Sequence, residues 1–274
     1  MRNDRLAMLK DTLNILDKGY YTKNFRRVAL PLTAEERWMA QVFLPGDLEP
    51  FAFPWKPEEG AKVLVENIDA FGLALRRHQE GCEKILVLNH ANPFNPGGGV
   101  RHGASAQEED LCRKSSLLLN LEGEQASPYY RYNIAKQSWL SSDALIISPC
   151  VEIIKDPDGT LLDKPVVVSV MTCAAPMIAG GLEGLSEEAY RDLLKHRIMT
   201  MLAAAAGKGY QTLVLGAWGC GAFANDAAVV AQIFLEALRQ IHYRHVFEHV
   251  DFAVLDRSPS RYNFNTFRDI LQKC

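Results

Sequence analysis

The sequence lacks any hydrophobic run long enough to cross a membrane. Its longest apolar stretches, such as residues 166–171, are far shorter than the roughly 20 residues that span a bilayer. No apolar signal-peptide core follows the polar residues 1–5. We therefore expect a soluble, intracellular protein, located in the cytoplasm and without a membrane partner.

Paired cysteines are also missing. The six cysteines are scattered, with no C-x-x-C pair and no Cys/His spacing typical of a zinc site. In a chain of this length such cysteines are expected to be reduced and mostly buried. The sequence therefore predicts no bound metal, and nothing in it calls for a cofactor.

Neither sign of charge dominates. The chain has 30 Lys and Arg residues against 33 Asp and Glu residues, which gives a formal net charge of −3. No global basic field exists to attract nucleic acid, so direct nucleic-acid binding is not expected. A polyanionic ligand remains compatible with this balance if backbone dipoles, rather than lysines, hold its phosphates.

What is present is an ordinary globular composition, with 48% hydrophobic and 23% charged residues in 274 positions. Residues 1–45 are polar with leucines at helical spacing, at positions 6, 9, 13 and 16. Thr33, followed by Glu35 and Glu36, is typical of a helix start. We predict an N-terminal helical extension over residues 1–45, packed on a single domain that spans residues 46–274.

From residue 61 onward, short β-branched runs alternate with helical patterns. Strands are expected at residues 62–66, 84–88, 144–148, 165–172, 212–216 and 249–255, and helices at residues 70–79, 187–207 and 225–241, with Ser186 and Asn225 as N-caps. The run at 84–88 is almost continuously apolar, as in a central strand covered on both faces. This alternation indicates a parallel or mixed sheet enclosed by helices.

A glycine triplet, Gly97-Gly98-Gly99, follows the expected strand at 84–88. The carboxyl end of a strand is where α/β sheets bind ligands. Three residues without side chains allow backbone N–H groups to approach a phosphate or a ribose closely. The triplet fits neither a Walker A loop nor a G-x-G-x-x-G motif, and a tight turn without a ligand is an equally good interpretation of the glycines alone.

The segment Gln107-Glu108-Glu109 follows this triplet. Two adjacent acids usually form a solvated helix start, but a loop of this length can fold back and bring them beside whatever the glycines hold. Desolvation there would raise the pKa of one carboxyl group and make it a proton donor near neutral pH. Cleavage of a glycosidic bond requires such a donor on the departing oxygen.

The triplet, seven further residues and then Gln-Glu-Glu resemble the GGG-x(6–8)-QEE signature of poly(ADP-ribose) glycohydrolases, in particular the microbial-type branch. The resemblance extends to residues 172–176, 215–225 and 252–256, and it covers about residues 60 to 270. It implies a macrodomain-like, three-layer α/β/α fold with a mixed central sheet and an appended N-terminal helical segment.

The resemblance also implies roles for individual residues. Glu109 would be the catalytic acid and base, and Glu108 and Gln107 would orient the scissile ribose. Asn92 would hydrogen-bond the distal ribose. Gly98, Gly99 and Val100 would line the diphosphate, and Gly97 would belong to the same substrate-binding loop.

A second glycine-rich loop lies between an expected strand and an expected helix. Flexible glycines, free amides and the positive end of a helix dipole make this segment an anion site in physical terms, although glycines that only permit tight packing would give the same pattern. By resemblance it is the phosphate-binding loop, with Gly216, Gly219, Cys220, Gly221, Ala222 and Phe223. Phe223 would stack near the proximal ribose or the adenine, or else belong to the core. Asp69 would accept from the adenine amine, or serve only as an acid at a helix start.

Three functions remain open at this point. The first is a glycosidase that hydrolyses ribose–ribose O-glycosidic bonds of poly(ADP-ribose), releases ADP-ribose and needs no cofactor. The others are a hydrolase of mono-ADP-ribosylated protein, nucleic acid or a small metabolite, and a reader that binds ADP-ribose without turnover. A reader has no need for Gln107-Glu108-Glu109, so the sequence favours the glycosidase. Its partners would be poly(ADP-ribose) or ADP-ribosylated protein, and its process would be reversal of ADP-ribosylation in the DNA damage response.

Overall fold

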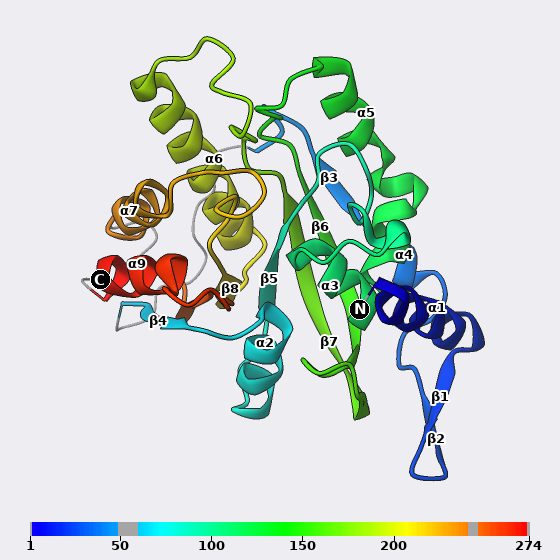
Figure 1. Cartoon of the computed structure of the whole chain (residues 1–274). Helices are drawn as coiled ribbons and strands as arrows, with labels where there is room; N and C mark the ends of the chain where they lie inside the picture. Colours follow the sequence, from blue (N-terminus) through cyan, green and yellow to red (C-terminus); the bar gives the residue numbers. More distant parts are fainter. Residues whose placement is uncertain (1, 49–59, 241–245, 273–274) are drawn as a thin grey trace.

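A mixed seven-stranded sheet forms the centre of the molecule (Figure 1). The computed structural model describes residues 2–48, 60–240 and 246–272. The strands lie in the order β3 (Gln41–Phe43), β6 (Leu145–Lys155), β7 (Leu161–Cys173), β5 (Ile85–His90), β8 (Thr212–Leu215), β9 (His249–Ala253) and β4 (Lys62–Glu66). From β7 to β4 all neighbours are parallel, whereas β6 pairs antiparallel with both β3 and β7.

Helices cover both faces of the sheet and complete the expected three layers. In the described residues they are α1 (Arg2–Lys18), α2 (Ala70–Gln79), α3 (Gln107–Lys114), α4 (Leu117–Glu122), α5 (Ser127–Lys136), α6 (Glu187–Gly207), α7 (Ala227–Leu238) and α9 (Tyr262–Leu271). Helices α6, α7 and α9 pack on one face, and α1 to α5 pack on the other. The predicted macrodomain-like α/β/α architecture is confirmed.

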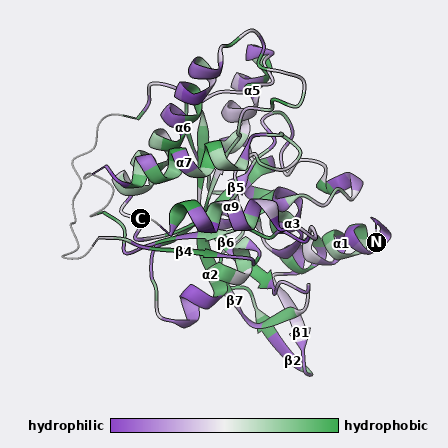
Figure 2. Ribbon diagram, turned by 60° about the vertical axis from the view of Figure 1, so that its left-hand side comes forward, coloured by the Kyte–Doolittle hydropathy of each residue, from purple (hydrophilic) through white to green (hydrophobic). Residues whose placement is uncertain are grey.

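Strand β5 shows why the sheet needs two helical layers. Its first five residues are all buried. Leu86 and Leu88 pack into the cluster formed with α6 and α7, while Ile85 and Val87 pack with α2 to α4 on the other face. Since successive strand residues point to opposite faces, a strand in this position is mostly apolar, and the buried Asn89 is the exception. Figure 2 shows the same division, with hydrophobic colour on the strands and mixed colour on the helices around them.

Several strands and helices begin or end at residues other than those predicted. The strand predicted at 144–148 continues to Lys155, because it pairs along its length with the long strand β7. The helix predicted to begin at Asn225 begins at Ala227, and its cap is Asp226, whose Oδ1 accepts from the amides of Ala228 and Val229. The Ser186 cap is confirmed by the hydrogen bond from the Ala189 amide. Residue 241, the last of the predicted helix, lies outside the described residues.

The N-terminal segment is only partly helical. Helix α1 is followed by the hairpin β1 (Tyr20–Lys23) and β2 (Arg26–Ala29), which projects from the body in Figure 1. Thr33 and Glu36 exchange the hydrogen bonds of a capping box, but they begin only the 3₁₀ turn Glu36–Trp38, because the chain is extended again at Met39. Strand β3 then enters the central sheet, so the last residues of the predicted extension belong to the sheet itself. The division of the chain at residue 45 stays a prediction.

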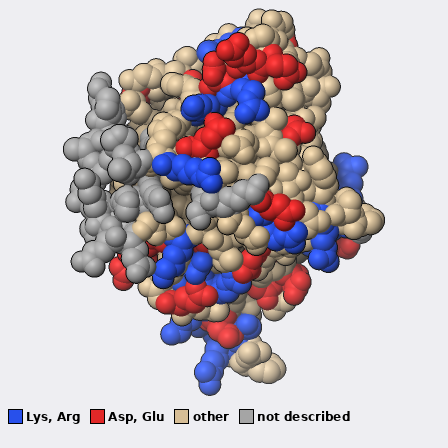
Figure 3. Space-filling model, turned by 90° about the vertical axis from the view of Figure 1, so that its left-hand side faces the viewer, with Lys and Arg blue, Asp and Glu red and all other residues tan. Residues whose placement is uncertain are grey.

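The surface carries both signs of charge. On the face shown in Figure 3, Lys and Arg side chains are interspersed with Asp and Glu side chains, in keeping with the near balance of the sequence. Among the described helices, none has the length and apolar character needed to traverse a bilayer.

Candidate active site

A cleft of about 410 Å³ opens at the carboxyl ends of the parallel strands. Its walls are formed by residues that follow β4, β5, β7, β8 and β9, together with the first turn of α3. The predicted site residues that line it are Asp69, Gln107, Gly219, Gly221, Ala222 and Phe223. The other predicted residues do not line the cleft: Asn92, Gly97, Gly98, Gly99, Val100, Glu108, Glu109, Gly216 and Cys220. The structure therefore divides the predicted site residues into those that line the cleft and those that do not.

The glycine triplet lies directly against the two acids of α3. A Cβ atom on Gly98 would lie 2.5 Å from Oε1 of Glu109 and 3.0 Å from Oε2 of Glu108. Gly98 also has a φ of +58°, which side-chain-bearing residues rarely adopt. Gly98 is thus free of a side chain because the two carboxyl groups occupy that space, whereas a Cβ on Gly97 would meet Leu118 and one on Gly99 would meet Ala104.

The backbone N–H groups of this loop are used within the protein. The Gly98 amide donates to Asn95 O (2.9 Å), the Gly99 amide donates to Glu109 Oε1 (2.8 Å) and the Val100 amide donates to Gly97 O (3.2 Å). The Val100 side chain is fully buried in the core. In this structure the loop amides position the carboxylates and the turn, rather than facing the cleft.

Glu108 is held on both oxygens. Its Oε1 accepts from Asn89 Nδ2 (3.2 Å), and its Oε2 accepts from the Asn92 amide (2.7 Å). The pKa of Glu108 is raised to about 8, mainly by burial. The hydrogen bonds from Asn92 and Asn89 lower it, and the charge of Glu109 adds to the increase. The raised pKa that the sequence predicted for one member of the pair therefore belongs to Glu108, whereas the resemblance assigns the role of acid to Glu109.

Glu109 differs from Glu108 in having one unused oxygen. Its Oε1 accepts from the Gly99 amide, while its buried Oε2 has no hydrogen-bond partner among the described residues. A buried carboxylate oxygen without a partner is costly, so its persistence points to a function at this atom.

Gln107 ties the start of α3 to strand β5. Its Nε2 donates to Leu88 O and its Oε1 accepts from the His90 amide, both at 2.8 Å. Asn89, between these two strand residues, is fully buried and donates to Thr172 Oγ1 as well as to Glu108. Asn89 was not among the predicted site residues. An asparagine inside an otherwise apolar strand was the available signal.

Asn92 and His90 both lie at the end of β5, but only His90 lines the cleft. The Oδ1 of Asn92 accepts from the amides of Phe94 and Asn95 (both 2.9 Å), so this side chain shapes the turn that leads to the glycines. His90, which was given no role, lines the cleft, and burial lowers its pKa to about 4. This imidazole is therefore neutral at physiological pH.

The second loop, residues 216–223, exposes its amides instead. The residues Gly219, Gly221, Ala222 and Phe223 all line the cleft. Within the described part of the chain, none of their four N–H groups donates a hydrogen bond. Free amides that converge on a cleft before a helix form an anion site.

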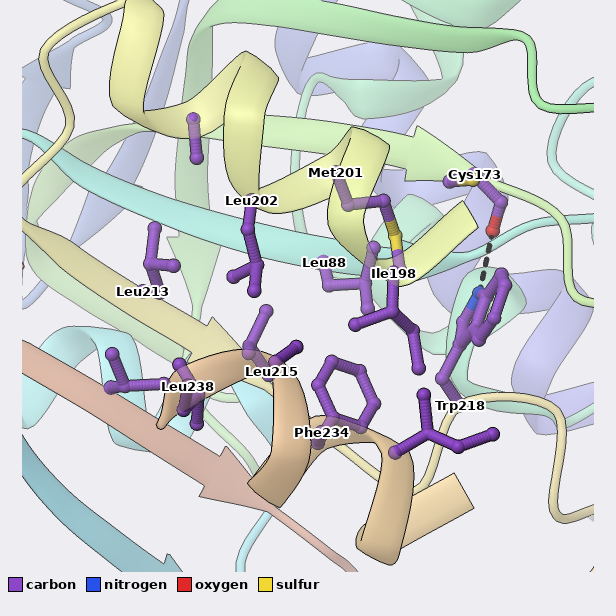
Figure 4. Packing of buried hydrophobic residues seen from close by; sticks show 14 of the residues in the cluster. Leu88, Cys173, Ile198, Met201, Leu202, Leu213, Leu215, Trp218, Phe234 and Leu238 are labelled. Atoms are coloured by element: carbon purple, nitrogen blue, oxygen red, sulfur yellow. Dashed lines mark hydrogen bonds between the residues drawn. The ribbon is translucent and has the colours of Figure 1, made fainter. Parts of the chain in front are cut away.

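Two buried residues hold this loop in shape. The indole of Trp218 is fully buried beside Ile198 and donates to Cys173 O (2.9 Å), as Figure 4 shows. Asn225 donates to Pro176 O and Gly219 O and accepts from the Tyr190 hydroxyl (2.6 Å). This is why Asn225 does not cap α7, and no pattern of residues around it indicated this anchoring role.

Gly216, Cys220 and Asp69 complete the predicted set. A Cβ on Gly216 would lie 2.8 Å from Ala253 O and 3.0 Å from His90 Nε2, so this glycine permits close packing behind the cleft. Cys220 is half-buried, and its thiol lies 3.6 Å from Trp218 O. Asp69 lines the cleft and also caps α2, with its Oδ1 accepting from the Gly72 amide (3.0 Å). Across the described residues, no three His, Cys, Asp or Glu side chains are grouped to hold a metal ion.

Comparison with known proteins agrees with this arrangement. The family model of the microbial-type poly(ADP-ribose) glycohydrolase (PARG) catalytic domain matches residues 9–156, more than half of the chain. No curated protein matches the sequence.

Solved structures of bacterial enzymes match nearly the whole chain. PARG from Thermomonospora curvata is similar with a TM-score of 0.90, at 31% identity over 98% of this chain and 99% of that one. The same enzyme bound to the inhibitor ADP-HPD gives 0.87, at 32% identity over 97% and 99%. PARG from Deinococcus radiodurans in complex with ADP-ribose gives 0.80, at 39% identity over 90% and 99%. The chain belongs to the microbial-type poly(ADP-ribose) glycohydrolase family.

Proposed function

We propose that this protein is a poly(ADP-ribose) glycohydrolase that hydrolyses ribose–ribose O-glycosidic bonds and releases ADP-ribose, with Glu109 as its general acid and base. The observation that carries the proposal is the unpartnered, buried Oε2 of Glu109, beside an oxygen that the Gly99 amide holds in place. One oxygen is fixed by the protein, and the other is left for the substrate.

Binding of ADP-ribose follows from the second loop. Solved relatives hold ADP-ribose or the inhibitor ADP-HPD. We place the diphosphate on the free amides of Gly219, Gly221 and Ala222, where the N-terminal end of α7 adds a favourable dipole. Phe223 would pack against the proximal ribose or the adenine, and Asp69 would accept from the adenine amine. Asn92, Gly97, Gly98, Gly99 and Val100 would then contribute at the distal ribose end through the turn they form.

The two carboxyl groups divide the catalytic work. Glu109 in its protonated form donates to the departing ribose oxygen as the C1″–O bond breaks, and the ribose gains oxocarbenium character. The resulting carboxylate then takes a proton from the water that attacks C1″, which regenerates the acid. Glu108 and Gln107 orient the scissile ribose. The high pKa of Glu108 keeps a proton in the pair at neutral pH and so limits the repulsion between two acids that meet at Gly98.

The biological setting is part of the same proposal. The partners would be poly(ADP-ribose) or ADP-ribosylated protein, and the process would be reversal of ADP-ribosylation in the DNA damage response. We place the protein in the cytoplasm, where its free thiols at Cys82, Cys112, Cys150, Cys173 and Cys220 would remain reduced.

The test is release of ADP-ribose from poly(ADP-ribose) by the wild type and by Glu109→Gln. Loss of a general acid and base typically lowers the rate by about 10²–10⁴-fold. We expect Glu109→Gln to lose turnover at this level and to retain ADP-ribose affinity in calorimetry. Equal rates in the two proteins would contradict the role of Glu109. Faster turnover of mono-ADP-ribosylated protein than of the polymer would instead favour a mono-ADP-ribosyl hydrolase.

A further inference from the structure

An exposed aromatic pair lies beside the catalytic turn. Trp139, just after α5, is 56% exposed. Its ring meets the ring of Phe94 edge to face, with 5.2 Å between centroids and 83° between planes. Neither ring lines the cleft. A tryptophan is usually buried, so one held at the surface against a second ring marks a candidate contact for a ligand.

The backbone around Trp139 is fixed. Its amide donates to Glu183 Oε1, and the hydroxyl of Ser138 donates to Glu183 Oε2, both at 2.7 Å. Its carbonyl accepts from the Met177 amide at 2.9 Å. These three hydrogen bonds fix the backbone that carries the ring, and the edge-to-face contact with Phe94 orients the ring itself, as a stacking site requires.

Two routes connect the pair to the active site. On one side, the Phe94 amide donates to Asn92 Oδ1, and the Asn92 amide donates to Glu108 Oε2 at 2.7 Å. On the other side, Ile178, next to Met177, donates its amide to the carbonyl of Phe223 at 2.9 Å. The pair is therefore connected both to Glu108 and to the second loop, although neither ring lines the cleft.

We infer that Trp139 and Phe94 form a stacking platform for the adenine on the leaving side of the scissile bond. This inference rests on the proposed function. If the cleft holds the ADP-ribose that is released, the departing oxygen belongs to an adenosine outside the cleft, next to Glu108 and Glu109. Its base is a flat aromatic group, and exposed aromatic side chains bind such bases by stacking.

The experiment compares two substrates that share the ADP-ribose held in the cleft and differ in the leaving group. One is poly(ADP-ribose), and the other is ADP-ribose with a methoxy group at C1″, which has no aromatic ring on the leaving side. In Trp139→Ala, the ratio of kcat/KM on the polymer to kcat/KM on the methoxy compound should fall about tenfold, through KM for the polymer, as expected for loss of one base stack. Trp139→Phe should restore the ratio to within about threefold of wild type, because it keeps an aromatic face.

Ile134→Ala is the matched control, since Ile134 is 54% exposed on the neighbouring α5 and should leave the ratio unchanged. A ratio in Trp139→Ala equal to that of wild type would overturn the platform, and so would an equal loss on both substrates. These outcomes are distinct from failure of the proposed function, in which the wild type itself would release no ADP-ribose from the polymer.

Discussion

The two glycine-rich loops, residues 97–100 and 216–223, follow the neighbouring parallel strands β5 and β8, yet they use their backbones in opposite ways. In the first loop the amides of Gly98, Gly99 and Val100 are all bonded within the protein, and one of them holds Glu109. In the second loop four amides that face the cleft have no partner in the described residues.

This difference shows that glycine serves two separate purposes at one site. At Gly98 the missing side chain makes room for carboxyl groups, so the loop is part of the acid–base apparatus. At Gly219 the chain has a positive φ of +76°, and the residues that line the cleft from Gly219 to Phe223 have N–H groups without partners among the described residues, so the loop is suited to an anion. Substitutions in the first loop should therefore affect turnover most, and those in the second should affect binding most.

The largest effect is expected for Gly98→Ala. The new methyl group would meet Glu109 Oε1 at 2.5 Å in a backbone conformation with φ of +58°. Displacement of the general acid should lower kcat by about 10³-fold, measured as ADP-ribose release from poly(ADP-ribose). Gly209→Ala is the control, since Gly209 has a φ of +73° and open space around its Cβ position. Wild-type kcat in Gly98→Ala would remove the distinction between the loops.

Gly219→Ala should act on the second loop. A Cβ there would lie 2.5 Å from both Ala175 Cβ and Asn225 Nδ2, so the loop would have to shift. Misplaced amides should weaken ADP-ribose binding by tenfold or more, or about 1.4 kcal/mol, in calorimetry. The control is Gly184→Ala, with a φ of +85° and no neighbour within 4 Å. A loss of kcat without a loss of affinity would contradict the assignment of this loop to binding.

A smaller effect concerns the pH dependence of stability. Because the pKa of Glu108 rises from 4.5 to about 8 on folding, the folded state binds more protons than the unfolded state between these values. The contribution of Glu108 to the free energy of unfolding is therefore fully present below about pH 4.5 and is lost as the pH rises to 8. His90, whose pKa is lowered to about 4, makes the free energy of unfolding rise with pH instead, but only below about pH 6.5.

Between pH 6.5 and 8 the free energy of unfolding of the wild type should thus fall by up to about 1.4 kcal/mol per pH unit from this group. Urea unfolding across this window would measure the slope, and Glu108→Gln should make it shallower. An identical slope in the two proteins would show that Glu108 does not titrate in this range.

The smallest effect separates two roles of Asp69. Asp69→Ala removes the cap of α2 and should cost about 1 kcal/mol of stability. Asp69→Asn should keep the cap and change only the charge at the cleft. If Asp69 also binds the adenine amine, both variants lose ADP-ribose affinity by a few-fold. Affinity that falls only in Asp69→Ala would indicate that the residue acts solely as a cap.

Much of the fold followed from local patterns. The strand at 62–66 and the helices at 70–79 and 187–207 lie where periodicity placed them, because each has a regular apolar pattern and two have a capping side chain. Strand β3 was missed because three residues at a sheet edge carry too little pattern to be recognised. Asn225 was misassigned because a polar residue before a helix is usually a cap, whereas here it bonds to Pro176, far away in sequence.

By itself, the sequence determined the α/β architecture, the family signature and the pairing of glycines with two adjacent acids. Those properties are encoded in the type and spacing of residues along the chain. Only the tertiary structure decided which loop has amides without a partner in the described residues, which carboxyl group has a raised pKa and which has a buried oxygen without a partner. The reason is physical: hydrogen-bond partners and desolvation depend on distant groups, such as Asn89 on Glu108, that folding alone brings together.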